Sequence, residues 1–351
     1  MTMYQLVFLI TILLQHSLAI HGNVQEFQIN ENIQRNENIG RVIPKINGKV
    51  THFSIVGDNS LAKQIFSVNR STGEITTKRP IDREEICKSQ KDYSCTVEFG
   101  VFVSVEDMNI SSKDLLIDIR VIIKDLNDNL PRFDSQTKYI NVSEASLVYS
   151  NFTLPTAVDL DEFRFSVIDY KLENGNCDKV AGKYAEHSMN DHFQLVLDQR
   201  PAGEQIRPVL NQIKAVDREA VAQLYGCLVA IDGESNMARQ QLIIKVIDVN
   251  DNSPQWTNAP YVVNINECQD QNGGNFYGRQ FITNLEATDI DDGLNGKVEL
   301  KIIDPGKDIP KLTISNGKLY ALSKLDHESL PRFEVKVEAS DGNSLTNVTT
   351  V

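Results

Sequence analysis

Short runs in which apolar and polar residues alternate recur along this chain, separated by turns rich in Gly, Asn and Pro. Residues 97–105 and 115–123 alternate in this way, and residues 66–68 and 74–77 flank a Gly-containing turn. A period of two is typical of strands with one buried face, and two such runs around a short turn predict a hairpin. No run has a capped 3.6-residue apolar stripe, so we expect seven or so short strands and no helix between residues 22 and 129.

Seven short strands in roughly 110 residues predict a β-sandwich, and a chain of this length suits two or three such domains. The chain has 351 residues, of which 41% are hydrophobic, so packed cores are available. Its net charge of -13 argues against nucleic acid or an anionic membrane as the partner.

Two copies of one acidic motif divide the chain. Residues 125–131 and 248–254 share the frame Asp-x-Asn-Asp-Asn-x-Pro, and each copy follows a strand-like run. Proline prevents a helix from continuing through the motif. Extended backbone points alternate side chains to opposite sides, which spreads the carboxylate and amide oxygens around one axis. Such oxygens suit hard cations.

Other short motifs keep one order around these copies. A lone Glu opens each unit, an Asp-x-Glu motif follows, and a later strand ends in Asp. In chain order the opening residues are Glu31, Glu144 and Glu267, the Asp-x-Glu motifs are 82–84, 217–219 and 326–328, and the strand-ending residues are Asp107, Asp232 and Asp341. Repetition of several motifs in a constant order indicates tandem repeats of one domain.

These motifs, together with Asp-x-Asp at 159–161 and 289–291, resemble those of the extracellular cadherin repeat. The first unit, with Cys87 and Cys95 after Asp-Arg-Glu, is similar to the opening repeat of protocadherins. The resemblance implies an all-β chain of tandem seven-stranded Greek-key β-sandwiches joined by calcium-binding linkers. The expected segments are a signal peptide at 1–19, repeat 1 at 22–132, repeat 2 at 133–255, and an incomplete repeat 3 at 256–351.

The resemblance also implies about three Ca²⁺ ions at each complete junction. The implied ligands of the first junction are Glu31, Asp82, Glu84, Asp125, Asn127, Asp128, Asp159, Asp161 and Asp232. Those of the second are Glu144, Asp217, Glu219, Asp248, Asn250, Asp251, Asp289, Asp291, Asn295 and Asp341. Eight carboxylates at the second junction repel one another, so we expect it to be loose without metal and stiff with metal.

The two junctions differ at one point. Residues 293–296 form a Gly-x-Asn-Gly sequence after Asp291, whereas Glu162 and Phe163 follow Asp161. We therefore expect the second junction to bind calcium more tightly than the first. Residues Glu267, Asp326 and Glu328 are half of a third junction and should bind weakly.

Residues 1–19 have a short apolar run and a small-x-small cleavage site, which predicts secretion; a signal-anchor helix is the alternative. An exported chain can carry disulfides and glycans. We expect Cys87 and Cys95 to form a local disulfide, with free thiols as the alternative, while Cys177 and Cys227 either pair or do not, and Cys268 is unassigned. Asn-x-Ser/Thr sequons lie at Asn69, Asn109, Asn141, Asn151 and Asn347.

The leading functional hypothesis is a calcium-dependent adhesion ectodomain at the cell surface, binding another cadherin ectodomain, with the same protein on an apposed cell as the expected partner. A calcium-stiffened spacer or heterophilic receptor module is the alternative. Trp256 is expected in a core, and no Trp lies near the mature N-terminus, so broad overlap of repeats is favoured over strand swapping. A glycosidase is disfavoured because the acids lie at junctions, and His187 and His192 are not a convincing zinc pair.

Overall fold

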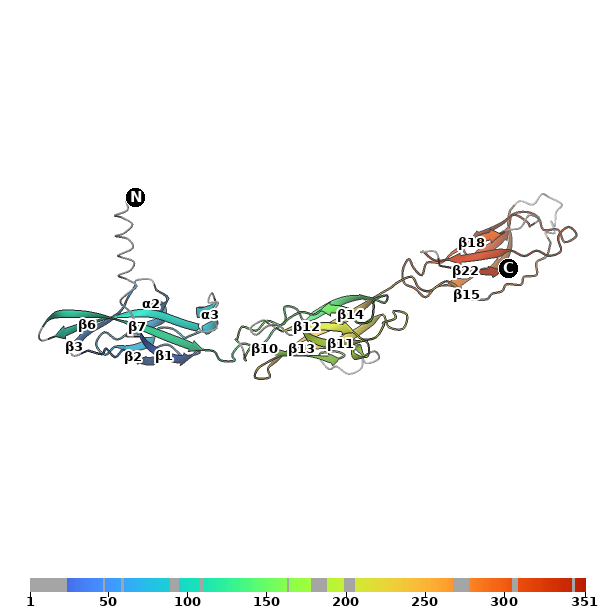
Figure 1. Cartoon of the computed structure of the whole chain (residues 1–351). Coiled ribbons are helices and arrows are strands. Elements are labelled where there is room, and N and C mark those ends of the chain that lie inside the picture. Colours follow the sequence, from blue (N-terminus) through green and yellow to red (C-terminus); the bar gives the residue numbers. More distant parts are fainter. Residues whose placement is uncertain are drawn as a thin grey trace, which may run out of the picture.

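Three β-rich units follow one another in a row in the computed structural model (Figure 1). None of the helices in its described part is long and apolar enough to cross a membrane. The predicted signal segment at 1–19 lies outside the described residues. These are 24–46, 48–57, 60–88, 95–107, 110–162, 164–177, 188–198, 206–267, 278–304, 309–342 and 345–351.

The first unit is a sandwich of two sheets. Its first strand pairs in parallel with its last, while the other neighbours are antiparallel. The four-stranded sheet has the order β1 (Val24–Asn30), β7 (Ile110–Lys124), β6 (Cys95–Asp107) and β3 (Lys49–Ile55). The three-stranded sheet has the order β2 (Asn38–Arg41), β5 (Glu74–Thr77) and β4 (Phe66–Val68). The predicted hairpin is therefore β4 and β5.

The second unit repeats this plan. Its four-stranded sheet has the order β10 (Val167–Asn174), β13 (Gln223–Asp232), β14 (Met237–Ile247) and β8 (Thr137–Ser143), with β8 parallel to β14. Its three-stranded sheet has the order β11 (Phe193–Asp198), β12 (Arg207–Gln212) and β9 (Asn151–Thr153). The repetition places the end of each last strand, β7 or β14, directly before an acidic linker.

The third unit has three small sheets in its described part. One has the order β18 (Glu299–Asp304), β21 (Lys336–Ser340) and β22 (Thr346–Thr350), and another β16 (Gln280–Asn284), β20 (Lys318–Ala321) and β19 (Leu312–Ser315). The third pairs β15 (Gln255–Trp256) with β17 (Ala287–Thr288). Trp256 packs against the core of this unit, as predicted, and its Nε1 donates to the carbonyl oxygen of Asn347 at 3.1 Å.

The prediction of a helix-free first unit is wrong in two places. Helix α2 (Leu61–Ile65) begins after Ser60, and α3 (Arg83–Cys87) begins after Asp82. Each cap side chain accepts a backbone N–H of the first turn, at 3.3 Å from Lys63 and at 2.8 Å from Glu85. A single turn is too short to show a 3.6-residue stripe, so the caps alone could have revealed these helices.

Apolar side chains from both sheets fill each sandwich. In the first unit Phe66 stacks on Phe99 with ring centroids 5.7 Å apart. In the second, Phe193, Leu210 and Leu228 are fully buried. Burial of this kind stabilises each side chain by roughly 1.5–3 kcal/mol. Each apolar core lies inside one unit. The contacts described below between a linker and its neighbouring units are therefore polar ones.

Truncation of one core side chain should destabilise the second unit selectively. Leu228→Ala is expected to cost about 2–5 kcal/mol of unfolding free energy, because it leaves a cavity between the two sheets. Ile168→Ala, on the adjacent strand β10, is the matched control because Ile168 is 46% exposed. Urea unfolding monitored by far-UV circular dichroism measures the unfolding free energy of both variants. Equal losses of unfolding free energy in the two variants would contradict the packing described.

Candidate functional site

In each of the first two units, a glutamate near the start joins that unit to the linker at its end. Glu31 is 2% exposed. One of its carboxylate oxygens accepts the backbone N–H of Leu126 at 2.6 Å, and the other accepts that of Arg83 at 3.1 Å. Glu144 does the same at the second junction, accepting from Val249 at 2.6 Å and from Arg218 at 2.8 Å. The opening glutamates therefore hold the Asp-Arg-Glu motif beside the linker.

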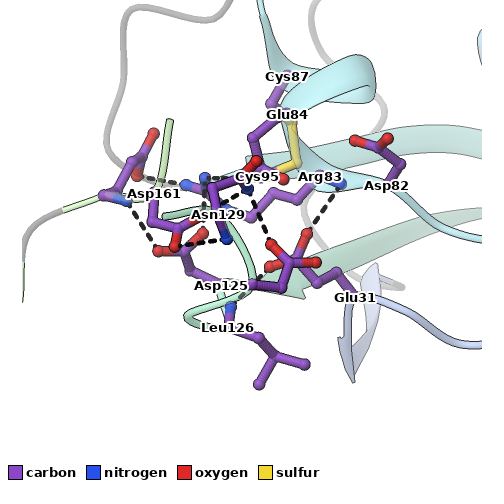
Figure 2. A network of polar contacts seen from close by, with 12 residues as sticks. Glu31, Asp82, Arg83, Glu84, Cys87, Cys95, Asp125, Leu126, Asn129 and Asp161 are labelled. Carbon is purple, nitrogen blue, oxygen red and sulfur yellow. Dashed lines mark hydrogen bonds and ion pairs between the residues drawn. A yellow bond between two sulfur atoms is a disulfide. The ribbon is translucent and has the colours of Figure 1, made fainter. Parts of the chain in front are cut away.

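The aspartate of each Asp-x-Glu motif stabilises its own turn. Asp82 caps α3, and Asp217 Oδ1 accepts the backbone N–H groups of Glu219 and Ala220 at 3.0 and 3.2 Å. A disulfide between Cys87 and Cys95 joins the end of α3 to the start of β6 (Figure 2). This disulfide fixes the short helix that carries Glu84 against the four-stranded sheet.

Each linker is also bound to the unit that follows it. Asn129 donates its side-chain and backbone N–H groups to Asp161, at 2.7 and 3.1 Å. Asp125 Oδ2 accepts the backbone N–H of Glu162 at 2.9 Å. The second linker repeats these contacts, from Asn252 to Asp291 at 2.8 and 3.3 Å, and from Asp292 to Asp248 at 3.1 Å.

These contacts bring many of the predicted ligands together. Carboxylate oxygens within 4.8 Å of one another come from Glu31, Glu84 and Asp125, and from Glu84, Asp128 and Asp161, at the first junction. At the second junction they come from Glu144, Glu219 and Asp251, and from Glu219, Asp248 and Asp291. Glu84 and Glu219 each take part in two groups. With oxygens this close, each of these two glutamates could be a ligand of two adjacent ions.

Other predicted ligands lie beside these groups. Asp232 Oδ2 accepts from Asn127 Nδ2 at 3.0 Å, and Asn295 Nδ2 donates to Asp248 Oδ2 at 2.8 Å. Asp159 Oδ2, Asp289 Oδ2 and Asn250 Oδ1 are buried and accept no hydrogen bond from any residue that the structure describes. Buried oxygens without a donor are costly, so these three fit a bound cation.

Burial disturbs the titration of several of these acids. It raises the pKa of Glu31 to about 7 and that of Asp159 to about 6, in each case with a contribution from neighbouring carboxylates. The pKa of Asp232 is lowered below its ordinary value. Burial acts in the opposite direction, but the hydrogen bonds from Asn236 and Asn127 outweigh it. The first junction therefore has more negative charge than its surroundings stabilise, which a divalent cation would correct.

Sequence reasoning missed two sets of residues at the junctions. The side chains of Asn129 and Asn236 hold Asp161 and Asp232, the latter at 2.7 Å from Asn236 Nδ2 to Asp232 Oδ2. The arginines of the Asp-Arg-Glu motifs, Arg83 and Arg218, point into the acidic groups and form ion pairs there. The sequence signal for the arginines was their exact repetition between an Asp and a Glu.

The two junctions share one backbone contact after the Asp-x-Asp motif. Phe165 N donates to Glu162 O at 3.0 Å, as Asn295 N donates to Asp292 O at 3.2 Å. The side chains still differ: Phe165 is buried in its own unit, whereas Asn295 contacts the linker. Tighter calcium binding at the second junction stays a prediction.

The third acidic group is the most exposed. Glu267, Asp326 and Glu328 bring carboxylate oxygens within 4.8 Å, and all three residues are exposed. His327 N donates to Glu267 at 3.3 Å, which repeats the contact made by the other opening glutamates. The structure therefore brings these three residues together, and their role as half of a third junction stays a prediction.

The remaining predicted sites are on the surface or in the second sandwich. Asn69, Asn141 and Asn151 are exposed, whereas Asn347 is half-buried and donates its Nδ2 to Pro254 O at 3.0 Å. A second disulfide joins Cys177 to Cys227, which settles the alternative that the sequence left open. Asn109, His187 and Cys268 lie outside the described residues.

Comparisons with known proteins agree with this geometry. A family model described as "Cadherin-like" matches residues 24–105, and one described as "Cadherin domain" matches residues 278–351. Protocadherin gamma-A3 of Pan troglodytes is 34% identical over 288 residues, which cover 80% of this chain and 27% of that protein. The chain belongs to the cadherin superfamily. Its units are cadherin repeats of the protocadherin type, and the chain spans about a quarter of the length of its curated protocadherin relatives.

Solved cadherin structures share this fold. The structure of PcdhgB3 EC1-4 has a TM-score of 0.75 and 26% identity, covering 93% of this chain and 73% of that one. The structure of mouse clustered PcdhgC3 EC1-3 has a TM-score of 0.72 and 23% identity, covering 93% of this chain and 97% of that one. The acidic groups around the two linkers therefore lie between consecutive cadherin repeats.

Acid should stabilise the first cadherin repeat in calcium-free buffer. The folded-state pKa of Glu31, about 7, is above its ordinary value of 4.5, so the folded chain binds this proton more tightly than the unfolded chain. Stability is then lost as pH rises through 7. Between pH 5.5 and 7.5 we expect a loss of about 1–2 kcal/mol, measured by urea unfolding at several pH values.

Two variants separate Glu31 from other titrating groups. Glu31→Gln should flatten this dependence, whereas Glu98→Gln, which removes an exposed partner of Arg120, should leave it intact. The same pH slope in Glu31→Gln and in the unsubstituted chain would refute the assignment.

Proposed function

We propose that this chain is the calcium-binding, adhesive part of a cell-surface protein, and that Ca²⁺ stiffens its repeat junctions. The observation that carries the proposal is the convergence of carboxylates from one repeat, the linker and the next repeat. Figure 2 shows this at the first junction, where Glu31, Glu84, Asp125 and Asp161 approach one another. A cation bound there would join three segments that otherwise repel one another.

The proposed ligand sets are those of the Asp-x-Glu, Asp-x-Asp and linker motifs at each junction. About three ions per complete junction would supply a charge of about +6 against eight carboxylates. Each ion would take its oxygens from carboxylates, from Asn127 or Asn250, and from backbone carbonyls. Extracellular modules of this kind bind calcium at about 0.1–1 mM, which matches an exported chain.

We further propose that the partner is another cadherin ectodomain, the same protein on an apposed cell. Support comes from the similarity to protocadherins and from the place of Trp256, which packs in the third repeat and is not available as an N-terminal anchor. Overlap of repeats from two straight ectodomains requires junctions that do not bend, so stiffness and adhesion are linked. The glycosidase alternative lacks support because the acids converge between repeats.

Loss of one shared ligand should weaken calcium binding at the second junction. Glu219 belongs to both acidic groups there, so Glu219→Gln removes a charge near two proposed ions. A unit charge about 6 Å from a divalent ion changes the binding free energy by about 1.4 kcal/mol even at the dielectric constant of water. We expect an affinity loss of about tenfold, measured by calcium titration of the melting temperature.

A matched control lies in the third repeat. Glu334 is exposed and pairs with Arg332, so Glu334→Gln should leave the calcium response unchanged. A chain whose melting temperature did not rise with calcium at millimolar concentration would refute the proposed calcium function.

Adhesion is tested separately from calcium binding. Beads coated with the ectodomain should aggregate in about 1 mM calcium and disperse in chelator, since rigid junctions are needed for repeats to overlap. Beads coated with Glu219→Gln should need more calcium. Calcium-dependent melting without aggregation would favour the spacer or heterophilic receptor and reject homophilic adhesion.

A further inference from the structure

Arg83 at the first junction is almost completely buried among acids, with 4% exposure. Its Nη1 lies 3.3 Å from Glu84 and 3.1 Å from Asp125, and its Nη2 forms an ion pair with Glu162. Glu84 belongs to the first repeat, Asp125 to the linker and Glu162 to the second repeat. One guanidinium therefore contacts all three segments that meet at this junction.

Arg218 makes the corresponding contacts at the second junction. It forms ion pairs with Glu219 in its own repeat and with Asp248 in the linker. Its Nη2 also donates to the backbone carbonyl of Ile290, in the third repeat, at 2.8 Å. Both arginines thus span a repeat, a linker and the next repeat, although the third partner is a carboxylate in one case and a carbonyl in the other.

An ordinary surface ion pair does not have these properties. Arg79 and Glu85 approach to 2.8 Å, but their side chains are 32% and 60% exposed and both lie in the first repeat. Such pairs are worth about 0–1 kcal/mol. Burial of a guanidinium is costly unless several acceptors surround it, so Arg83 depends on its three carboxylates and they depend on it.

The arginines and calcium would use the same carboxylates. Glu84 and Asp125 are partners of Arg83 and members of the acidic groups of the first junction, and Glu219 and Asp248 are in the same position at the second. A guanidinium at 3.1 Å from Asp125 reduces the negative potential that attracts a cation.

We propose that the arginine of each Asp-Arg-Glu motif is an internal cation that links consecutive repeats and competes with calcium for the same carboxylates. The link requires no metal, so the junctions keep some alignment when calcium is low. The competition rests on the proposed calcium function, whereas the link does not. The first junction has the stronger link because Glu162 adds a carboxylate from the next repeat.

Arg83→Gln tests both parts in the whole chain. Spin labels attached through unnatural amino acids at exposed Ile43 and Val196 report the distance distribution between the first two repeats. In chelator the variant should give a distribution at least about twice as wide as the unsubstituted chain, because the contact to Glu162 is lost. Arg79→Gln is the matched control and should change nothing.

Calcium titration of the same labelled proteins tests the competition. Removing a positive charge should let calcium narrow the distribution at a concentration about threefold to tenfold lower than in the unsubstituted chain. If Arg83 had only a structural role, its removal would not tighten calcium binding. An unchanged distribution in chelator, or an unchanged or raised calcium midpoint, would overturn the corresponding part of the proposal.

Glu162→Gln tests the link independently, in case the Arg83→Gln variant misfolds. The Glu162 side chain is 35% exposed, and its loss leaves the contacts of Arg83 to Glu84 and Asp125 in place. This variant should widen the distribution in chelator without lowering the calcium midpoint, and an unchanged width would reject the link. If the unsubstituted chain shows no calcium response, the proposed calcium function fails while the chelator measurements still decide the link.

Discussion

Carboxylates from separate segments converge at each junction, and their mutual repulsion is the constraint on which the arrangement of repeats depends. The buried Glu31 accepts backbone N–H groups from two segments, and Glu144 does the same one repeat later. Burial, with a smaller contribution from the Glu84 carboxylate, raises the pKa of Glu31, and these hydrogen bonds offset the shift only in part. Positive charge, from arginine or from a bound cation, is what such an arrangement requires.

The apolar cores are separate from the junctions. The cores stabilise each repeat, whereas the junctions determine how consecutive repeats are aligned. Each sandwich buries its own aromatic and aliphatic side chains between two sheets. The junctions contain polar contacts in their place, so the proposed calcium binding would act on the alignment of the repeats rather than on their apolar cores. The disulfide at Cys87 connects the two functions because it fixes α3, which carries Arg83 and Glu84, to the sheet.

The two junctions have the same backbone contacts but different side-chain contacts. Asp125 and Asp248 both accept an N–H from the next repeat, yet Glu162 pairs with Arg83 at the first junction, whereas Asn295 donates its amide to Asp248 at the second. A linker motif that is almost identical in sequence can therefore have different stiffness and different cation affinity, because its neighbours in the following repeat differ.

Local patterns in the sequence determined the strands, the order of the motifs and the superfamily, because alternation and linker residues act over a few positions. The short helices were missed since one turn leaves no periodicity. Only the tertiary structure decided which oxygens converge, that Cys177 pairs with Cys227, and that Arg83 contacts Glu162. These partners lie far apart in the chain, and Asn127 and Asp232 are separated by 105 positions. Packing within the second repeat brings the two cysteines together, and packing of one repeat against the next brings the junction residues together. No local pattern contains that information.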